Sequence, residues 1–225
     1  MKWELHAHTA QSSRCSLMPA AELVARHAEA GFSGIVITDH YNDYNVSYRP
    51  GTPLEQAKSW LGGYEKARAA GEKSGLVVLF GAEVTLLGGP NDYLVYGAQP
   101  ALLLENPELY KLELPALHAL TRRYHALLIQ AHPNRLDFCS PANPADVDGY
   151  EVFNGNPRHH SHNELTAALA KEHPSLVYTA GSDYHQIADL GTGIMDFPED
   201  IRTSAQLADC LRRGAFTRMI GPEEG

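Results

Sequence analysis

The sequence predicts an α/β fold in which strands alternate with helices, and two observations support this class. Short runs of apolar and β-branched residues, typical of buried strands, recur along the chain, and amphipathic stretches typical of helices lie between them. Alternation of this kind implies parallel strands with right-handed crossovers. At 225 residues the chain is long enough for one α/β barrel or for two small domains. No repeat, low-complexity tract or linker marks a domain boundary.

Five of the strand-like runs end on residue types that bind metals. The runs cover residues 2–5, 34–38, 77–82, 127–131 and 176–182, and they lead into His6 and His8, Asp39 and His40, Glu83, His132, and Asp183 and His185. Carboxyl ends of parallel strands meet on one face of a barrel or an open sheet, so these side chains are expected to lie together. Two further runs, near 84–86 and 93–96, predict a hairpin after Glu83. A final strand is expected near 216–220, and about seven strands would form the barrel.

Amphipathic stretches predict the helices. Several of them begin with Pro near the first turn, and Gly31 and Gly75 are placed where a helix stops. The predicted helices cover residues 19–30, 53–73, 107–125, 158–172 and 204–213. The segment 41–52, rich in Tyr and Asn, is predicted to be a long loop that either covers the site as a lid or packs on the surface.

Composition limits the classes of function. A net charge of −9 and a pI near 5.7 argue against a nucleic-acid-binding surface, although a local basic pocket stays compatible with them. The chain shows neither a charged-then-apolar leader nor an apolar run long enough to cross a bilayer, so we expect a cytoplasmic protein without membrane partners. The scattered Cys15, Cys139 and Cys210 fit a reducing compartment. Nothing in the helical faces demands a partner, and the oligomeric state stays open.

The residue types at the strand ends indicate the chemistry. His, Asp and Glu collected there, with little Cys in the chain, suit Zn, Mn or Fe at a hydrolytic site rather than a structural zinc site. The sequence carries no Gly-x-Ser-x-Gly elbow, no phosphate-binding Gly-rich loop with Lys-Ser or Lys-Thr and no dinucleotide fingerprint. The strand ends are therefore the place where a reaction centre is expected.

The order of these motifs resembles the polymerase-and-histidinol-phosphatase (PHP) family. The resemblance covers nearly the whole chain and is carried by His6-x-His8, Thr38-Asp39-His40, Gly81-x-Glu83, Ala131-His132-Pro133 and Gly181-Ser182-Asp183-x-His185. It implies a single PHP domain over residues 1–225, folded as a distorted (β/α)7 barrel with its metal cluster at the carboxyl ends of the strands. It also implies two to three divalent metals (Zn, Mn or Fe) and hydrolysis of a phosphoester, with a small phosphorylated metabolite as the partner.

The resemblance also implies a role for each matching residue. His6, His8, Glu83 and Asp183 would hold a first metal, Glu83 would bridge to a second metal on His132, and His40 with His185 would hold a third. Metals in such a cluster convert a shared water to hydroxide near neutral pH, and the hydroxide attacks phosphorus. Asp39 is interpreted as a carboxylate of the catalytic group that orients an imidazole rather than as a ligand.

Two positions depart from the family's fullest pattern. Gln99 stands where many three-metal members place a His, so the second metal would take Gln99 or water as a ligand. The loop after His8 offers Cys15 where a His or Asp is usual. A Cys15 thiolate would favour a softer metal such as Zn, or else Cys15 is a bystander.

The segment from Glu151 to Asn163 predicts a substrate pocket. Arg158 is a candidate phosphate clamp, and His159 or His160 is a candidate general acid for the leaving alkoxide. The alternative is a polar helix start with solvated side chains. Arg14 and Arg135 follow the first and fourth strands and are further candidates for phosphate contact, although a salt bridge to Asp137 or Asp146 would also explain Arg135.

Three functions compete at this point. A metal-dependent phosphoesterase is the first hypothesis. A metal-dependent hydrolase of C–N or C–O bonds is the second, since barrel hydrolases with similar ligand sets perform that chemistry. A non-catalytic PHP-like module ranks last, because the main ligands are all present in the chain.

Overall fold

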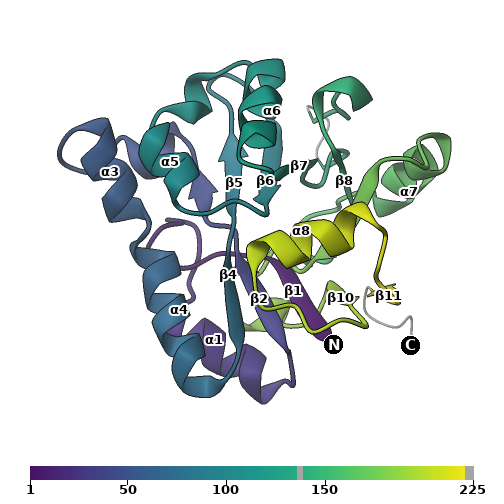
Figure 1. The fold of residues 1–225 in the computed structure, drawn as a ribbon, viewed down its shortest axis with the longest axis horizontal. Helices are drawn as coiled ribbons and strands as arrows, with labels where there is room; N and C mark the ends of the chain where they lie inside the picture. Colours follow the sequence, from purple (N-terminus) through teal and green to yellow (C-terminus); the bar gives the residue numbers. More distant parts are fainter. Residues whose placement is uncertain (136–138, 221–225) are drawn as a thin grey trace.

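The computed structural model describes residues 1–135 and 139–220, in which two mixed sheets form the centre of an α/β fold (Figure 1). The first sheet has the strand order β11-β10-β1-β2-β4, and the second has the order β3-β5-β6-β7-β8-β9. The strands are β1 (Lys2–Ala7), β2 (Gly34–Ile37), β3 (His40–Tyr41), β4 (Val77–Phe80), β5 (Ala82–Thr85), β6 (Asp92–Tyr96), β7 (Leu127–Gln130), β8 (Gly149–Asn154), β9 (Val177–Gly181), β10 (Ile194–Asp196) and β11 (Arg218–Ile220).

Strand directions confirm the expected parallel pairing for part of each sheet. β1, β2 and β4 pair in parallel, as do β3 with β5 and β7 with β8 and β9. The predicted hairpin is confirmed as β5 and β6, and β6 is antiparallel to β7 as well. The final strand is confirmed as β11, but it pairs antiparallel with β10, which the sequence did not indicate.

The two sheets approach each other on both sides of the site. Tyr184, just after β9, donates its backbone N–H to the oxygen of His6 at 2.9 Å and accepts one from His8 at 2.9 Å. Gly181 permits this approach, because a Cβ there would lie 2.4 Å from the Cβ of His6. On the other side, β4 continues into β5 through Gly81, whose N–H bonds the oxygen of Ile37. A closed seven-stranded barrel stays a prediction.

Helices surround the strands, with α8 crossing in front of them in Figure 1. The α-helices are α1 (Ala20–Glu29), α2 (Asp43–Val46), α3 (Pro53–Trp60), α4 (Gly62–Ser74), α5 (Ala101–Glu105), α6 (Leu114–Arg123), α7 (Asn163–Glu172) and α8 (Ser204–Arg212), and the short 3-10 helices are η1 (Leu109–Lys111), η2 (Pro144–Asp146) and η3 (Ile187–Asp189). The predictions for α1 and α8 are confirmed within one residue at each end.

Three predicted helices differ from the structure for local reasons. The stretch 53–73 is two helices with a break at Leu61, and Gly63 in the second comes so close to Thr9 that a Cβ would lie 2.2 Å from Thr9 Oγ1. The stretch 107–125 is helical as α6 only from Leu114, with Pro115 in its first turn, where a missing N–H is tolerated. The stretch 158–172 becomes α7 only after His162, whose φ of 47° interrupts a right-handed helix.

Trp3 at the start of β1 anchors the apolar core beneath the strand ends. Its side chain is fully buried and meets the ring of Phe197 edge-on, with centroids 6.4 Å apart. Gly34 on the neighbouring β2 leaves room for the indole, because a Cβ at this position would lie 2.3 Å from a Trp3 ring carbon. The indole therefore fixes how β1 packs on β2 and on the segment after β10.

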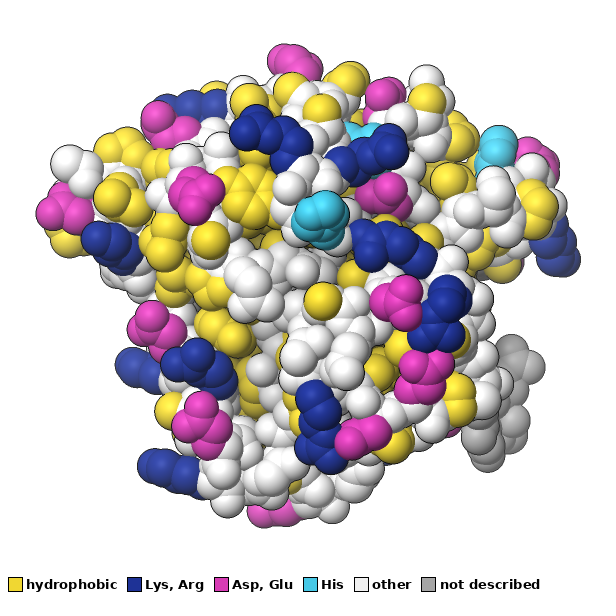
Figure 2. Space-filling view, in the orientation of Figure 1, with side chains coloured by type: hydrophobic (Ala, Val, Ile, Leu, Met, Phe, Trp, Pro, Cys, Tyr) yellow, Lys and Arg dark blue, Asp and Glu magenta, His cyan; other side chains and the backbone are white. Residues whose placement is uncertain are grey.

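The surface is mixed in character. Figure 2 shows acidic and basic side chains interspersed over the face in view, so the excess of acidic residues is not gathered in one patch there. Within residues 1–135 and 139–220, the helices all fall short of the length and hydropathy that crossing a bilayer requires.

We expect Trp3→Ala to lower the free energy of unfolding by about 3–5 kcal/mol, because the change leaves a cavity in a closely packed core. Urea denaturation followed by circular dichroism measures the loss. Leu87→Ala, at a side chain that is 62% exposed, serves as the control and should change stability little. A Trp3→Ala protein as stable as the unchanged chain would contradict the anchoring role of the indole.

Candidate metal centre

Seven of the predicted metal-binding side chains converge at one end of the strands. They come from segments far apart in the sequence, and their ligand atoms form overlapping groups within 4.8 Å of one another. These residues are His6, His8, His40, Glu83, His132, Asp183 and His185. Strand ends that were expected to meet therefore do so, and five separate segments of chain supply the cluster.

Glu83 lies at the centre of the cluster. Its Oε1 is 3.3 Å from His6 Nε2 and 3.1 Å from His132 Nε2. Its Oε2 is 2.8 Å from His40 Nδ1 and 3.5 Å from His8 Nε2. The carboxylate is fully buried, and its two oxygens face different pairs of imidazoles. This arrangement is the one that a carboxylate bridging two cations needs.

Asp183 occupies the opposite side of the cluster. Its Oδ1 lies 3.3 Å from His8 Nε2, 3.2 Å from His185 Nδ1 and 3.6 Å from His6 Nε2. Its Oδ2 accepts a hydrogen bond from Arg135 Nη2 at 2.7 Å. One oxygen therefore faces the imidazoles, and the other is held by a guanidinium.

The electrostatics of the cluster keep both carboxyl groups ionised. Burial alone raises the pKa of Glu83, but the charges of His40 and His6 outweigh it and hold that pKa well below its usual value. Burial likewise raises the pKa of Asp183, and the charges of His6 and Arg135 overcome it and hold the pKa well below the ordinary range. Ionised carboxylates in a buried cavity favour bound cations.

Unsatisfied polar atoms indicate that the cluster fits metal ions. His6 Nε2 and His8 Nε2 are buried and lack a hydrogen-bonding partner among the described residues, and His40 Nδ1 and Glu83 Oε2 face each other at 2.8 Å without the geometry of a hydrogen bond. Buried polar atoms without partners are costly and uncommon. Here they converge within one cluster, and imidazole nitrogen with carboxylate oxygen is a donor set suited to Zn, Mn or Fe.

Backbone strain concentrates at the same place. Within residues 1–135 and 139–220, four residues other than glycine have a positive φ, and two of them are His132 at 29° and Asp183 at 51°. Such conformations cost about 1–3 kcal/mol each and tend to occur at functional sites. The surrounding structure therefore holds these two side chains in place against a local preference of the chain.

Glu151 on β8 supports the cluster from outside, and sequence reasoning missed it. Its Oε1 lies 2.8 Å from His6 Nδ1, and its Oε2 accepts hydrogen bonds from the backbone of His132 at 3.1 Å and from Asn154 Nδ2 at 2.9 Å. A carboxylate on the far nitrogen of a ligating His fixes the ring orientation. The available signal was an acidic residue inside a strand-like run.

Asp39 contacts the cluster indirectly, through Ser13. Its carboxylate accepts hydrogen bonds from the Thr9 backbone at 2.6 Å and from Ser13 Oγ at 2.8 Å. Ser13 Oγ in turn lies 3.2 Å from His8 Nδ1 and accepts a bond from the backbone of His40 at 2.9 Å. The structure thus places Asp39 one side chain away from the imidazole it was expected to orient directly.

Asp92 is a candidate ligand that the sequence did not reveal. It forms a group with His40 and Glu83, and its Oδ2 lies 3.9 Å from His132 Nε2. The residue is the first of β6, which runs antiparallel to its neighbours. The amino end of an antiparallel strand lies beside the carboxyl ends of the adjacent strands, so a search limited to carboxyl ends passes over it.

The same antiparallel direction carries Gln99 away from the cluster. Tyr96, at the carboxyl end of β6, pairs with Leu127 at the start of β7, whereas His132 follows the end of that strand. Gln99 lies beyond Tyr96 and is exposed. The geometry therefore offers Asp92, and not Gln99, to the second group of ligands.

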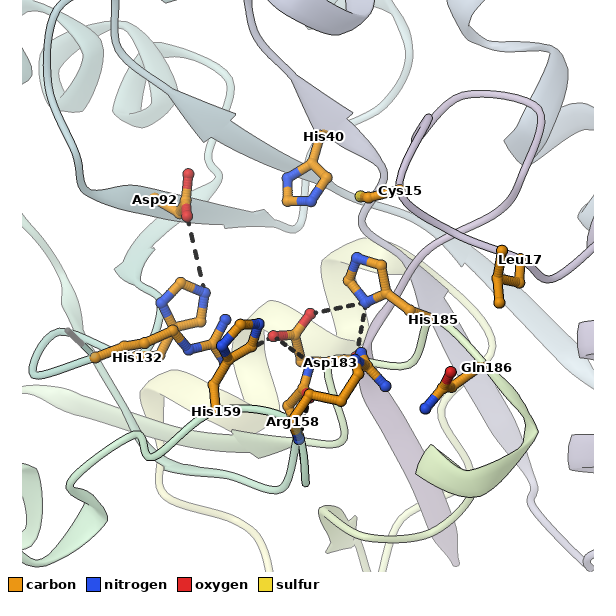
Figure 3. Close-up of a pocket in the computed structure, with 12 residues that line it drawn as sticks. Cys15, Leu17, His40, Asp92, His132, Arg158, His159, Asp183, His185 and Gln186 are labelled. Carbon is orange, nitrogen blue, oxygen red and sulfur yellow. Dashed lines mark hydrogen bonds and ion pairs between the residues drawn. The ribbon is translucent and has the colours of Figure 1, made fainter.

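Cys15 lies at the rim of the cluster, and its side chain points toward His40 and His185 in Figure 3. Burial raises the pKa of the thiol, but hydrogen bonds with His185 and His40 outweigh it and lower the pKa to about 6. The three neighbouring imidazoles of His8, His40 and His185 form their own ligand group. Cys15 is placed where a thiolate would add to that group.

A cavity of about 350 Å³ opens above the cluster (Figure 3). Arg135, Arg158 and His159 contribute to its lining, together with Asp92 and the rim residues. The lining residues are Cys15, Leu17, His40, Asp92, His132, Arg135, Asn156, Arg158, His159, Asp183, His185 and Gln186. The cavity thus combines the candidate metal ligands with two guanidinium groups and an exposed imidazole.

The two arginines of the cavity are held by different carboxylates. Arg135 is buried against Asp183, so the expected pairing with Asp146 is not the contact observed, and Asp137 lies outside the described residues. Arg158 places Nη1 2.5 Å and 2.7 Å from the two oxygens of Asp189. It belongs to the loop before α7, not to the helix itself.

Two other predicted residues lie outside the cavity lining. Arg14 is exposed and stacks on Tyr44 and Tyr48, with 4.1 Å and 4.7 Å from its guanidinium carbon to the ring centroids. His160 is exposed, and its ring packs against His162 with centroids 4.1 Å apart. The stacking of Arg14 ties the segment 41–52 to the loop after β1.

Comparison with known proteins agrees with this architecture. The family model described as PHP domain matches residues 4–191. A PolC-type DNA polymerase III from Latilactobacillus sakei subsp. sakei (strain 23K) is 32% identical over 84 residues, which are 37% of this chain and 5% of that protein. The chain thus spans only a small part of the length of that polymerase.

Solved structures share the fold at low sequence identity. A two-domain protein from Bacteroides vulgatus ATCC 8482, described as containing a predicted PHP-like metal-dependent phosphoesterase, superposes with a TM-score of 0.70 at 15% identity. The match covers 96% of this chain and 63% of that one. An amidohydrolase from Chromobacterium violaceum, with bound sulfate and no metal, gives a TM-score of 0.60 at 16% identity and covers 99% of this chain and 98% of its own.

We expect Asp92→Asn to bind less metal than the unchanged chain, because Asn keeps the shape of the side chain but loses the charge that attracts a cation. Plasma mass spectrometry on protein purified without chelator gives the metal content per chain. His132→Ala shows the loss expected on removing a ligand that the sequence predicted, and the exposed Asp200→Asn is the matched control. Full metal content in Asp92→Asn would remove Asp92 from the ligand set.

We expect Glu151→Gln to weaken metal affinity by about 10- to 100-fold, because the amide no longer supplies a negative charge to fix the His6 ring. Titration with metal against a competing chelator measures the affinity. Glu72→Gln, at an exposed position on α4, should leave it unchanged. Equal affinity in the two variants would show that Glu151 serves the fold alone.

Proposed function

Because this chain belongs to the PHP domain family, we propose that it is a metal-dependent phosphoesterase that hydrolyses a small phosphorylated metabolite. One observation carries the proposal. Seven convergent metal-binding side chains, several with unsatisfied buried atoms, lie beside a cavity that four of them line together with Arg135, Arg158 and His159. Metal ligands facing cationic side chains across a small space suit a phosphoryl group, which binds both.

The ligand groups support two to three divalent ions, with Zn, Mn or Fe as candidates. His6, His8 and Asp183 would hold the first, together with one oxygen of Glu83. His132 and Asp92 would hold the second with Glu83. The remaining group would hold the third and consists of His8, His40 and His185, with Cys15 beside them. Such ions, when bound, supply Lewis acidity toward phosphoryl oxygens and lower the pKa of a water nucleophile.

The two arginines of the cavity have different roles. Asp189 orients Arg158 through Nη1 alone, and Arg158 also lines the cavity. A guanidinium held this way binds phosphoryl oxygens with little loss of side-chain entropy. Arg135 instead holds Asp183 in place and neutralises one of its oxygens. Arg158 is therefore our candidate for direct contact with the substrate.

His159 is our candidate for the proton donor to the leaving alkoxide. It lines the cavity, whereas His160 packs on His162 outside it. Burial lowers the pKa of His159, and the charge of Arg135 lowers it further. The lowered pKa reduces the protonated fraction of His159 near neutral pH, but it makes the protonated imidazole a stronger acid toward a strongly basic leaving group.

Cleavage of C–N or C–O bonds is the competing function. The cationic side chains argue for phosphate, since a carboxamide or lactone offers no negative charge for Arg158 to bind. Inorganic phosphate as a competitive inhibitor would support the phosphoesterase. Hydrolysis of an amide or lactone without inhibition by phosphate would favour the alternative.

The test of the proposal is turnover of 4-nitrophenyl phosphate with added Mn²⁺ or Zn²⁺. We expect His6→Ala and Asp183→Ala to lower kcat/KM by at least about 100-fold, since even the outer partners of metal ligands contribute up to that factor. His173→Ala, at the end of α7 and outside the cluster, is the matched control. A metal-loaded protein that is inactive on a broad panel of phosphoesters would overturn the assignment.

A further inference from the structure

An apolar groove adjoins the metal cavity and shares two residues with it. The groove is lined by Leu17, Met18, Glu22, Gln186, Ile187 and Ala188, and Leu17 and Gln186 also line the cavity. In Figure 3 these two side chains lie beyond His185, on the side away from His132. The groove therefore extends the cavity outward from the edge of the candidate metal centre.

The groove exposes large apolar side chains that folding does not require. Leu17 is 72% exposed and Ile187 is 53% exposed, while Met18 between them is buried and forms the floor. The carboxylate of Glu22, the charged group in this lining, is bonded to Arg26 at 2.6 Å and 2.9 Å. Exposed apolar surface at the mouth of a site usually marks a place where a ligand binds.

Both walls of the groove are fixed to the metal centre. Leu17 donates its backbone N–H to the oxygen of His185 at 2.9 Å. On the other wall, Asp189 accepts hydrogen bonds from the backbone N–H groups of His185 at 2.8 Å and Gln186 at 3.0 Å. Asp189 also pairs with Arg158. The groove thus has a defined position relative to the guanidinium that we assign to the phosphoryl group.

We propose that this groove binds the leaving group of the substrate and that the leaving group is apolar. The inference rests on the proposed function, because it takes the phosphoryl group to lie between the metal ligands and Arg158. A phosphoryl group held there directs its ester substituent out of the cavity, and the mouth toward Leu17 and Gln186 leads directly onto apolar surface. The substrate class is accordingly a phosphomonoester of an apolar alcohol, rather than of a polyol such as glycerol.

The test uses ethyl-, butyl- and hexylphosphonate, which bind but are not hydrolysed, and the Mn²⁺-loaded protein. We expect the dissociation constant from calorimetry to fall by about two- to fourfold for each added methylene, as burial of a CH₂ group predicts. In Ile187→Ser, which alters the groove but no residue of the cavity lining, this dependence on chain length should weaken, while ethylphosphonate binds as before. Leu87→Ser, at an exposed leucine in neither lining, is the matched control.

The outcomes separate this inference from the proposed function. Equal affinity for all three phosphonates overturns the groove as a leaving-group site and leaves the phosphoryl site standing, whereas no affinity for any of them overturns the phosphoryl site as well. A dimer that forms with increasing concentration and is lost in Ile187→Ser would also overturn it, by assigning the patch to a second copy. Tighter binding of the longer phosphonates, together with failure to hydrolyse the matching alkyl phosphates, supports the groove as a binding site for apolar substituents but overturns the phosphoesterase and, with it, the role of the groove in binding a leaving group.

Discussion

The fold depends on keeping one buried carboxylate, Glu83, among imidazoles from several other segments. An ionised carboxylate without water is costly unless charges and hydrogen bonds compensate it. Here His6, His40 and His132 approach within 3.3 Å of its oxygens, so the ends of three other chain segments must converge on β5. The two sheets are joined at this place, and the strained backbone of His132 shows that the convergence is maintained against local preference.

Two further carboxylates support the ligands of the cluster from outside the cavity. Glu151 contacts both the ring of His6 and the backbone of His132, and Asp39 reaches His8 through Ser13. These carboxylates do not face the cavity, so their contribution is to fix ring orientation rather than to meet a substrate. The same division applies to the arginines. Arg135 is committed to Asp183, whereas Arg158 keeps part of its guanidinium toward the cavity.

The antiparallel strand β6 explains why Asp92 escaped sequence reasoning. A rule that places function at the carboxyl ends of strands assumes that all strands run the same way. β6 reverses direction between β5 and β7, so its first residue, Asp92, reaches the cluster, and Gln99 beyond its last residue does not. The hairpin was predictable from the turn residues after Glu83. Which residue of the hairpin reaches the site could be determined only from the register of the strand pairing.

The sequence by itself determined the fold class, the family and the members of the central cluster, because apolar runs that end in His, Asp or Glu encode both strand and ligand locally. His6, His8, Glu83 and Asp183 were identifiable for that reason. Tertiary structure alone decided which polar residues serve these ligands and which line the cavity. Glu151, Asp92 and the apolar wall of Leu17 and Ile187 act through neighbours distant in the chain, and such contacts leave no periodic pattern in the sequence.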